Sequence, residues 1–212
     1  MAALGDDQVL RLARGVIRAE GKAVLAALGA LDDAFVQVAR LLAACTGKVL
    51  VTGSGTSGAV AFRCAHLLSV GGTPAFHLSP ADGLHGGLGV LRPGDIVLAL
   101  SKGGSSAELN EFCSRARALC GCLVVVTASP GSALGAMADH VIRLTLDADA
   151  DLGAVVATGS SLATAAVVDA LVEVGRVARD YSWEDLLFTH PSGAVGRDAA
   201  QSLDRLAKSE GG

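Results

Sequence analysis

The sequence has few aromatic residues, little net charge and no long apolar run. Aromatic residues make up only 3% of the 212 residues, although 51% are hydrophobic, so the core must be built from Ala, Val and Leu. Such a core is typical of helices packed closely on a Val-rich parallel sheet. The length suits one α/β domain with a sizeable core and is short for two.

The charge balance argues against two classes of partner. The net charge is −4 at pH 7, so the chain lacks the concentrated basic face that nucleic acids require, and we expect no nucleic-acid partner. No run reaches the roughly 18 apolar residues of a membrane span. The N-terminus opens with Asp6 and Asp7 instead of the basic residues of a signal peptide. We therefore expect a cytoplasmic protein without a membrane partner.

The cysteines lack the spacing of a redox or zinc motif. There are five, an odd number in a chain that is not small, so we expect no disulfide framework. Cys120 and Cys122 are separated by one residue instead of the two of a Cys-x-x-Cys motif. We interpret the cysteines as small buried hydrophobic residues.

The histidines give no metal pattern either. His77 and His85 lie eight residues apart with Asp82 between them, and this spacing matches no recognised set of metal ligands. We therefore expect no required metal and no other cofactor.

Short apolar runs alternate with helical stretches from residue 48 onward. We expect strands at 49–51, 74–78, 95–100, 122–126 and 140–144. We expect helices at 57–69, 106–119, 158–179 and 183–190, and a short one from Ser132. This alternation predicts an α/β fold with a doubly wound, five-stranded parallel sheet flanked by helices. Ligands of such sheets bind beyond the carboxyl ends of the strands.

The segment before the first strand is predicted to be helical over residues 6–45. Apolar residues in its second part repeat in steps of four and three, which is typical of a seam between two helices. This pattern favours a subunit interface and hence a homo-oligomer, while packing on the chain's own domain is the alternative. The seam residues are Val24, Leu28, Leu31, Phe35, Val38 and Leu42.

A glycine-rich turn follows the first strand. Glycines let the backbone approach a ligand, and hydroxyls add donors where the next helix exposes free N–H groups. The turn has no Walker lysine, and its third glycine comes one residue too early for a dinucleotide site. An ordinary tight strand–helix turn is the alternative. The candidate phosphate-binding residues are Gly53, Ser54, Gly55, Thr56 and Ser57.

A second turn repeats this arrangement after the strand at 95–100. Lys102 adds a positive charge for a phosphate, although it could equally be a solvated loop lysine. Either Ser105 or Ser106 could simply cap the next helix. Two hydroxyl-rich turns at adjacent strand ends nevertheless predict a phosphate site. Its residues in this turn are Ser101, Lys102, Ser105 and Ser106.

The turns belong to a longer series of motifs. The others are Gly72-Thr73-Pro74-Ala75-Phe76, the stretch 80–89, Thr158-Gly159-Ser160-Ser161 and the final His190-Pro191-Ser192-Gly193-Ala194-Val195-Gly196. In this order they resemble the sugar isomerase (SIS) domain family, and within it the isomerase domain of arabinose-5-phosphate isomerases. The resemblance covers most of the chain, from about Lys48 to Arg197.

The resemblance implies an organisation and an activity. Residues 1–45 would form the N-terminal helical segment and oligomer interface, residues 46–197 the SIS domain, and residues 198–212 a polar tail. We expect the chain to lack the paired regulatory (CBS) modules that often follow the domain. The implied activity is sugar-phosphate aldose–ketose isomerisation through an enediol(ate), in a homotetramer. A non-catalytic sugar-phosphate sensor or regulator is the alternative.

The resemblance also implies site residues. Glu108 is the first candidate for the base, because a helix N-terminus keeps a carboxylate ionised, and Asp149 is the alternative base. His190 is the candidate for ring opening or proton shuttling. His85 lies in a turn where the family has a histidine, and Thr73 joins the binding residues. Active sites of the family can borrow a histidine from a second subunit, here His85 or His190.

Two departures from the family pattern involve a lysine. Thr56 stands where the family often has lysine, whereas Lys102 lies in a loop that usually reads Ser-Asn-Ser-Gly-Glu. We interpret Lys102 as a partial replacement for the missing charge. Without the resemblance, Glu108 could equally be an ordinary helix carboxylate and Asp149 part of a solvated acidic loop. A histidine before proline, as at His190, is more often structural.

Overall fold

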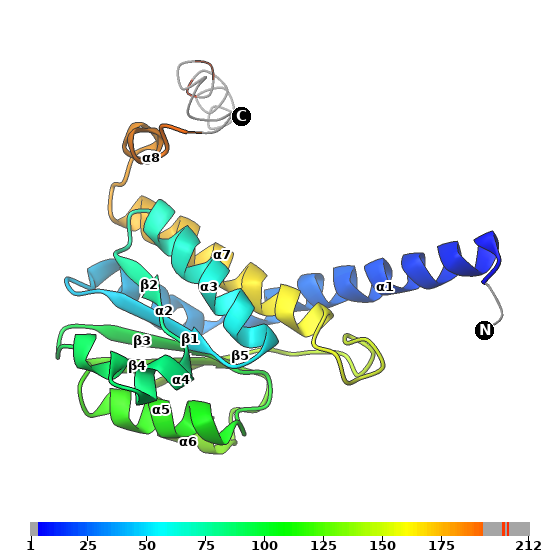
Figure 1. Ribbon diagram of the computed structural model, residues 1–212. Coiled ribbons are helices and arrows are strands. Elements are labelled where there is room, and N and C mark those ends of the chain that lie inside the picture. Colours follow the sequence, from blue (N-terminus) through cyan, green and yellow to red (C-terminus); the bar gives the residue numbers. More distant parts are fainter. Residues whose placement is uncertain (1–3, 193–200, 202, 204–212) are drawn as a thin grey trace.

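The central strands are mostly apolar and almost completely buried, because helices cover both faces of the sheet. The structure is a computed structural model that describes residues 4–192, 201 and 203. Its five strands form one parallel sheet in the order β2-β1-β3-β4-β5 (Figure 1). This confirms the predicted doubly wound sheet. The strands are β1 (Val49–Gly53), β2 (Ala75–His77), β3 (Ile96–Leu100), β4 (Cys122–Thr127) and β5 (His140–Arg143).

Helices form a layer on each face of the sheet. One layer packs on a core cluster that includes Val49, Val51 and Leu98, and the other packs on a cluster that includes Leu50 and Val97. The first layer holds α2 (Asp33–Ala44), α3 (Thr56–Val70) and α7 (Gly159–Ala178). The second layer holds α4 (Pro80–Leu84), α5 (Ala107–Arg117) and α6 (Ala133–Met137) (Figure 1).

The chain reverses direction across the sheet between β1 and β3. From β1 it goes outward to β2, then returns to place β3 on the other side of β1. The carboxyl ends of β1 and β3 therefore lie side by side at a topological switch point, where open α/β sheets bind ligands. Both hydroxyl-rich turns begin at these two strand ends.

The continuous helical seam expected over 24–42 is wrong. The helix ends as α1 (Asp6–Ala26) and a 3₁₀ turn, η1 (Ala27–Ala30). Asp32 then caps a new helix, since its carboxylate accepts hydrogen bonds from the N–H groups of Ala34 and Phe35. The chain changes direction at this break, so the two halves of the seam differ in burial. Phe35, Val38 and Leu42 are core residues, whereas Val24, Leu28 and Leu31 are exposed.

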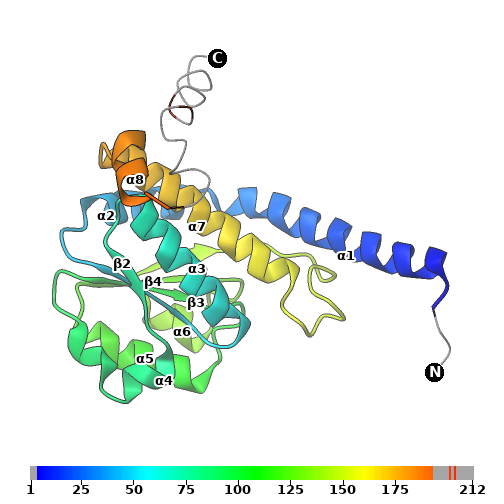
Figure 2. The same cartoon turned by 45° about the horizontal axis from the view of Figure 1, so that its top comes forward.

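The first half of α1 is an arm that projects away from the domain (Figures 1 and 2). Near its end the helix lies against α7, where a Cβ on Gly159 would be 3.1 Å from the Cβ of Ala23. Ala23 is the one buried residue of α1. The arm itself exposes large apolar side chains, including Val9, Leu12 and Ile17.

Two short elements between β2 and β3 are additions to the predicted fold. Helix α4 starts at Pro80 after Ser79, whose hydroxyl accepts a hydrogen bond from the N–H of Asp82. A 3₁₀ turn, η2 (Gly87–Val90), follows it. Serine before proline, with an acidic residue in the first turn, is a helix-start signal.

Helix α8 (Trp183–Thr189) is fixed at the far end of α7. Ser182 and Asp185 form a reciprocal capping box at its start. The Arg176 guanidinium of α7 stacks over the Trp183 ring at 4.0 Å from its centroid. The motif residues 193–196 and the predicted tail 198–212 lie outside the described residues, apart from 201 and 203.

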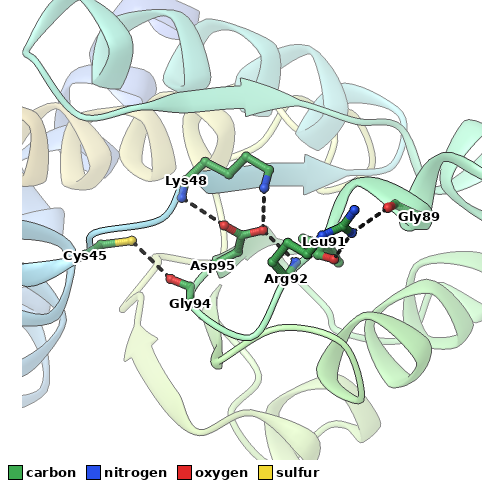
Figure 3. Close-up of polar contacts among 7 residues, drawn as sticks. All are labelled: Cys45, Lys48, Gly89, Leu91, Arg92, Gly94 and Asp95. Carbon is green, nitrogen blue, oxygen red and sulfur yellow. Dashed lines mark hydrogen bonds and ion pairs between the residues drawn. The ribbon is translucent and has the colours of Figure 1, made fainter.

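A buried carboxylate joins β1 and β3 at the amino edge of the sheet (Figure 3). Asp95, with a side chain only 2% exposed, accepts from the Lys48 ammonium at 2.6 Å and from the Lys48 N–H at 3.0 Å. It also accepts from the N–H of Arg92. Burial alone would raise the pKa of Asp95, but these hydrogen bonds outweigh it and hold the pKa below its ordinary value.

The five cysteines are free thiols, three of them buried. Burial raises the pKa of Cys64 and of Cys113 to about 12, so neither is a reactive thiolate at neutral pH. In the part of the chain that the structure describes, no helix has the length and apolar character to cross a membrane.

Candidate functional site

The first hydroxyl-rich turn is tight because α3 begins directly behind β1. A Cβ on Gly53 would lie 2.8 Å from the carbonyl carbon of Ser57, and one on Gly58 would lie 2.8 Å from the oxygen of Gly53. Gly55 has φ +57°, which favours glycine. Thr56 and Ser57 open α3, and Ser54 is half-buried in the turn between strand and helix.

The second turn lies against the first. The Ser106 hydroxyl donates a hydrogen bond to the Ser54 hydroxyl at 3.4 Å. Within the second turn, Ser101 Oγ accepts from the N–H of Gly104, which has φ +62°. Ser105, which lies between Gly104 and Ser106, is exposed. The structure thus brings together the two groups of hydroxyls that the sequence assigns to phosphate binding.

Free N–H groups at two helix starts point to an anionic ligand. Helices α2, α4, α6 and α8 each have a side-chain cap. Among the described residues, α1, α3, α5 and α7 have no N-cap side-chain hydrogen bond, although in α7 the N–H of Ser160 is bound by Asp151. The N-cap residues of α3 and α5, the two helices that start at the hydroxyl-rich turns, are Gly55 and Ser106. Ser106 directs its hydroxyl to Ser54 instead. Uncapped N–H groups and the helix dipole make such ends suited to phosphate.

Two candidate catalytic residues flank these turns on the α4–α5 side. Glu108 lies in the first turn of α5, two residues after Ser106, and is exposed. His85 ends α4, which packs on α5 through Gly83 and Phe112, and is also exposed. Neither side chain has a hydrogen bond or ion pair to another described residue, so both are open to a ligand.

The acidic segment after β5 approaches the site from the other side. Asp149 is exposed and lines a groove of about 530 Å³ between residues 148–154 and the α1 arm. Asp151, two residues further on, is buried and binds the Lys102 ammonium at 2.6 Å. Lys102 is therefore at the edge of the site, with its charge already paired.

Asp151 is the residue that sequence reasoning missed. Burial alone would raise its pKa, but hydrogen bonds from Lys102 and Ser160 outweigh it and hold the pKa below its ordinary value. In the sequence, aspartates alternate with alanines at Asp147, Asp149 and Asp151. Nothing in this pattern marks one of the three aspartates as buried.

Two predicted site residues lie at the opposite end of the chain's own fold. Thr73 precedes β2 at the amino edge and is 2% exposed. His190 ends α8, beyond the far end of α7 (Figure 1). Helix α7 starts beside Asp151 and has 20 residues, so it separates the two ends by about 30 Å. The structure brings neither residue to the turns within one chain.

Metal ligands do not gather at the site. Within the described residues, no group of three or more His, Cys, Asp and Glu side chains is arranged to hold a metal ion. The His77 ring instead stacks edge-on against Phe62 at 5.8 Å.

The geometry agrees with comparisons to known proteins. The SIS domain model matches residues 42–174. The chain belongs to the SIS domain family. The arabinose 5-phosphate isomerase GutQ of Salmonella typhi is 34% identical over 178 residues, which are 84% of this chain and 56% of that protein. KdsD of Pseudomonas aeruginosa, also an arabinose 5-phosphate isomerase, is 36% identical over 185 residues, 87% of this chain and 57% of that protein.

Solved SIS-fold structures superpose over most of the chain. A Listeria monocytogenes protein described as a candidate sugar-phosphate isomerase has a TM-score of 0.85 at 29% identity, covering 90% of this chain and all of that one. An Escherichia coli CFT073 protein in complex with arabinose 5-phosphate has a TM-score of 0.84 at 25% identity, covering 89% of this chain and all of that one. The chain spans just over half the length of the curated relatives.

Proposed function

We propose that this chain is an aldose–ketose isomerase of phosphorylated sugars, with arabinose 5-phosphate as the first candidate substrate. The main support is the meeting of two uncapped helix N-termini and the hydroxyls of Ser54 and Ser106 at one sheet edge. A phosphate dianion would satisfy these donors. The similarity to GutQ and KdsD supports arabinose 5-phosphate in particular.

The proposed chemistry is a proton transfer between neighbouring carbons. A carboxylate removes the proton from C2 of the open-chain aldose, and the C2–H electrons form a C1–C2 double bond while the C1 oxygen becomes an oxyanion. A proton then passes from the C2 hydroxyl to the C1 oxygen, and the carboxylic acid returns its own proton to C1 as the C2 carbonyl forms. Glu108 is the first candidate for the base, since it is exposed beside the hydroxyls, and Asp149 is the second.

The proposed site is completed by a second copy of the chain. His190 is held by α8 at the far end of α7, and the capping box and the Arg176–Trp183 stack anchor α8 there. To open the ring, His190 must then come from a neighbouring subunit. We assign this role to His190 and keep His85, which is in the α4–α5 layer, as a residue of the chain's own site.

The arm supports the oligomer that this requires. Val9, Leu12 and Val16 repeat in steps of three and four along α1. Val9 and Leu12 are exposed and Val16 is half-buried, and Leu12 and Val16 line the groove beside residues 148–154. Exposed apolar residues in such a row are typical of a helix that pairs with another helix. A homotetramer is the proposed assembly, in the cytoplasm.

Incubation with phosphorylated sugars in D₂O tests the proposed function. Arabinose 5-phosphate should yield its ketose with deuterium at C1, and hexose and heptose phosphates serve as the comparison panel. Glu108→Gln should lower kcat by about 10²- to 10⁴-fold and leave the Kd for the sugar phosphate within about twofold. A chain that exchanges no deuterium with any of these sugars is not an isomerase.

The same experiment separates the alternative function. A sensor or regulator would be stabilised thermally by a sugar phosphate without turnover, and Glu108→Gln would then leave the cellular function unchanged. Turnover by the wild-type chain excludes this alternative.

A further inference from the structure

Two ion pairs of the same geometry lie at opposite edges of the sheet. Lys102 Nζ is 2.6 Å from Asp151 Oδ2, and Lys48 Nζ is 2.6 Å from Asp95 Oδ2. Both aspartate side chains are 2% exposed, and both lysines are partly exposed. The pairs differ in what else each carboxylate binds, and this difference indicates different tasks.

Asp95 binds backbone N–H groups of two segments in addition to the Lys48 ammonium. It accepts from the N–H groups of Lys48 and Arg92 as well as from the ammonium (Figure 3). These contacts would keep β1 and β3 joined even without the Lys48 ammonium. The Lys48–Asp95 pair is therefore structural.

Asp151 contacts the second turn only through an ammonium. Its other hydrogen bonds come from the N–H of Ser160 at 2.9 Å and the hydroxyl of Ser160 at 2.8 Å, both at the start of α7. The carboxylate is thus anchored to α7, and in the part of the chain that the structure describes it is linked to the hydroxyl-rich turn by the Lys102 ammonium.

Lys102 is fixed at both ends. Its carbonyl oxygen accepts hydrogen bonds from the N–H of Ala128 and the hydroxyl of Thr127, each at 3.0 Å. Its ammonium is held by Asp151. The side chain is still 46% exposed, and an ammonium has three donors. Donors not used by Asp151 are therefore available to an anion in the neighbouring turn.

We propose that Asp151 is a positioning residue that holds the Lys102 ammonium beside the hydroxyl-rich turns, where it binds the phosphate of the sugar. Holding the flexible lysine stem in advance lowers the entropy lost when the phosphate binds. The same contact connects the segment that contains Asp149 to the phosphate end of the site. This inference rests on the proposed sugar-phosphate site and adds a residue to it.

A double-mutant cycle tests the inference. Asp151→Asn, Lys102→Met and the double variant are compared with the wild-type chain by calorimetric titration with arabinose 5-phosphate. Asp151→Asn should raise the Kd about 3- to 30-fold when Lys102 is present. In the Lys102→Met background the same change should alter Kd less than about twofold, because the residue through which Asp151 acts is gone.

The matched controls use the second ion pair and a milder variant. Lys48→Met with Asp95→Asn should lower the thermal midpoint and leave Kd for the folded protein unchanged. Ser160→Ala removes one bond to Asp151 without removing the carboxylate, and it should raise Kd about two- to fivefold. This variant tests the proposal even if Asp151→Asn does not fold.

The outcomes separate this inference from the proposed function. Equal rises in Kd in both backgrounds, or no rise in Asp151→Asn and Ser160→Ala, overturn the positioning role while the sugar-phosphate site stands. If the wild-type chain binds neither arabinose 5-phosphate nor inorganic phosphate, the site itself is wrong, and the inference is overturned with it.

Discussion

The Ser106 hydroxyl lies 3.4 Å from the Ser54 hydroxyl, to which it donates a hydrogen bond. This contact joins residues 52 positions apart and connects the turns after β1 and β3. Since Ser106 uses its hydroxyl here, the first N–H groups of α5 keep no side-chain cap among the described residues. The two serines therefore hold the turns together and leave the helix end open to an anion.

Replacing either serine should weaken sugar-phosphate binding. Ser106→Ala is expected to raise the Kd for arabinose 5-phosphate about tenfold, since hydrogen bonds to charged groups contribute roughly 1.5–3 kcal/mol. Ser114→Ala is the matched control, because Ser114 is exposed on the same helix. Calorimetric titration compares the variants, and equal affinity for Ser106→Ala and Ser114→Ala would exclude a binding role for Ser106.

A side chain at position 53 should damage the fold and the site together. The Cβ of Gly53→Ala would lie 2.8 Å from backbone atoms of Ser57, so α3 must shift away from β1. We expect a loss of about 1–3 kcal/mol in unfolding free energy and weaker phosphate binding. Gly131→Ala is the control, because no atom lies within 4 Å of its Cβ. Urea unfolding of both variants measures the difference, and similar values contradict the tight turn.

The Lys48–Asp95 pair predicts a particular acid dependence. The pKa of Asp95 is lowered in the folded chain, so the pair stabilises the fold above the ordinary aspartate pKa of about 3.9. This stabilisation is lost as the pH falls through the lower, folded-state pKa. Asp95→Asn should lower the free energy of unfolding by about 2 kcal/mol at pH 7. The free energy of unfolding of this variant should also fall less steeply as the pH is lowered.

The acid loss in Asp95→Asn should not disappear, because the pKa values of Asp139 and Asp151 are lowered as well. Urea titrations from neutral pH to about pH 2 measure both slopes. Parallel slopes for the wild-type chain and Asp95→Asn would show that Asp95 does not contribute to the acid dependence.

The arm predicts an assembly that one charge can disrupt. Leu12 is 57% exposed and lies on the apolar stripe that borders the groove, so Leu12→Asp should dissociate the oligomer at micromolar concentration. Leu119→Asp introduces the same charge at an exposed leucine after α5 and should leave the assembly intact. Light scattering coupled to size exclusion measures both masses. A wild-type mass near the 21.2 kDa of one chain would contradict the oligomer.

Mixing two impaired variants tests the origin of the histidine. Glu108→Gln and His190→Asn, each expected to be strongly impaired alone, should regain activity when they are co-refolded. Sites at which one chain supplies Glu108 and its neighbour supplies His190 are about one quarter of a random mixture. If His190 acted within its own chain, no mixed site would contain both residues, and activity would not return.

Sequence patterns predicted the sheet well because its strands are short apolar runs between glycine-rich or polar turns. The boundaries of β3 and β4 differ from the expected ones by one residue. The break before α2 was missed because the apolar period continues across it. Asp32 was the available signal, as an aspartate in the N-cap position of a new helix.

The site was predictable where parallel topology determines it. Turns that follow β1 and β3 must meet at one edge, so the contact between Ser54 and Ser106 follows from strand order. By the same logic Thr73, which precedes a strand, must lie at the other edge. Burial of Asp151 was not predictable, since it depends on partners 49 and 9 residues away, Lys102 and Ser160.

The direction of the arm has a consequence for how water would reach a ligand in the proposed site. Followed from its C-terminal end toward its N-terminus, helix α1 passes Gly159 and then the segment with Asp149. Its N-terminal half therefore extends past the edge of the sheet that holds the serine turns. A second copy bound along the arm would stand over the entrance to those turns. The second copy would then exclude solvent from the oxyanion intermediate of the proposed reaction. Dilution would dissociate the copies and expose the site to water at concentrations at which the chain is still folded.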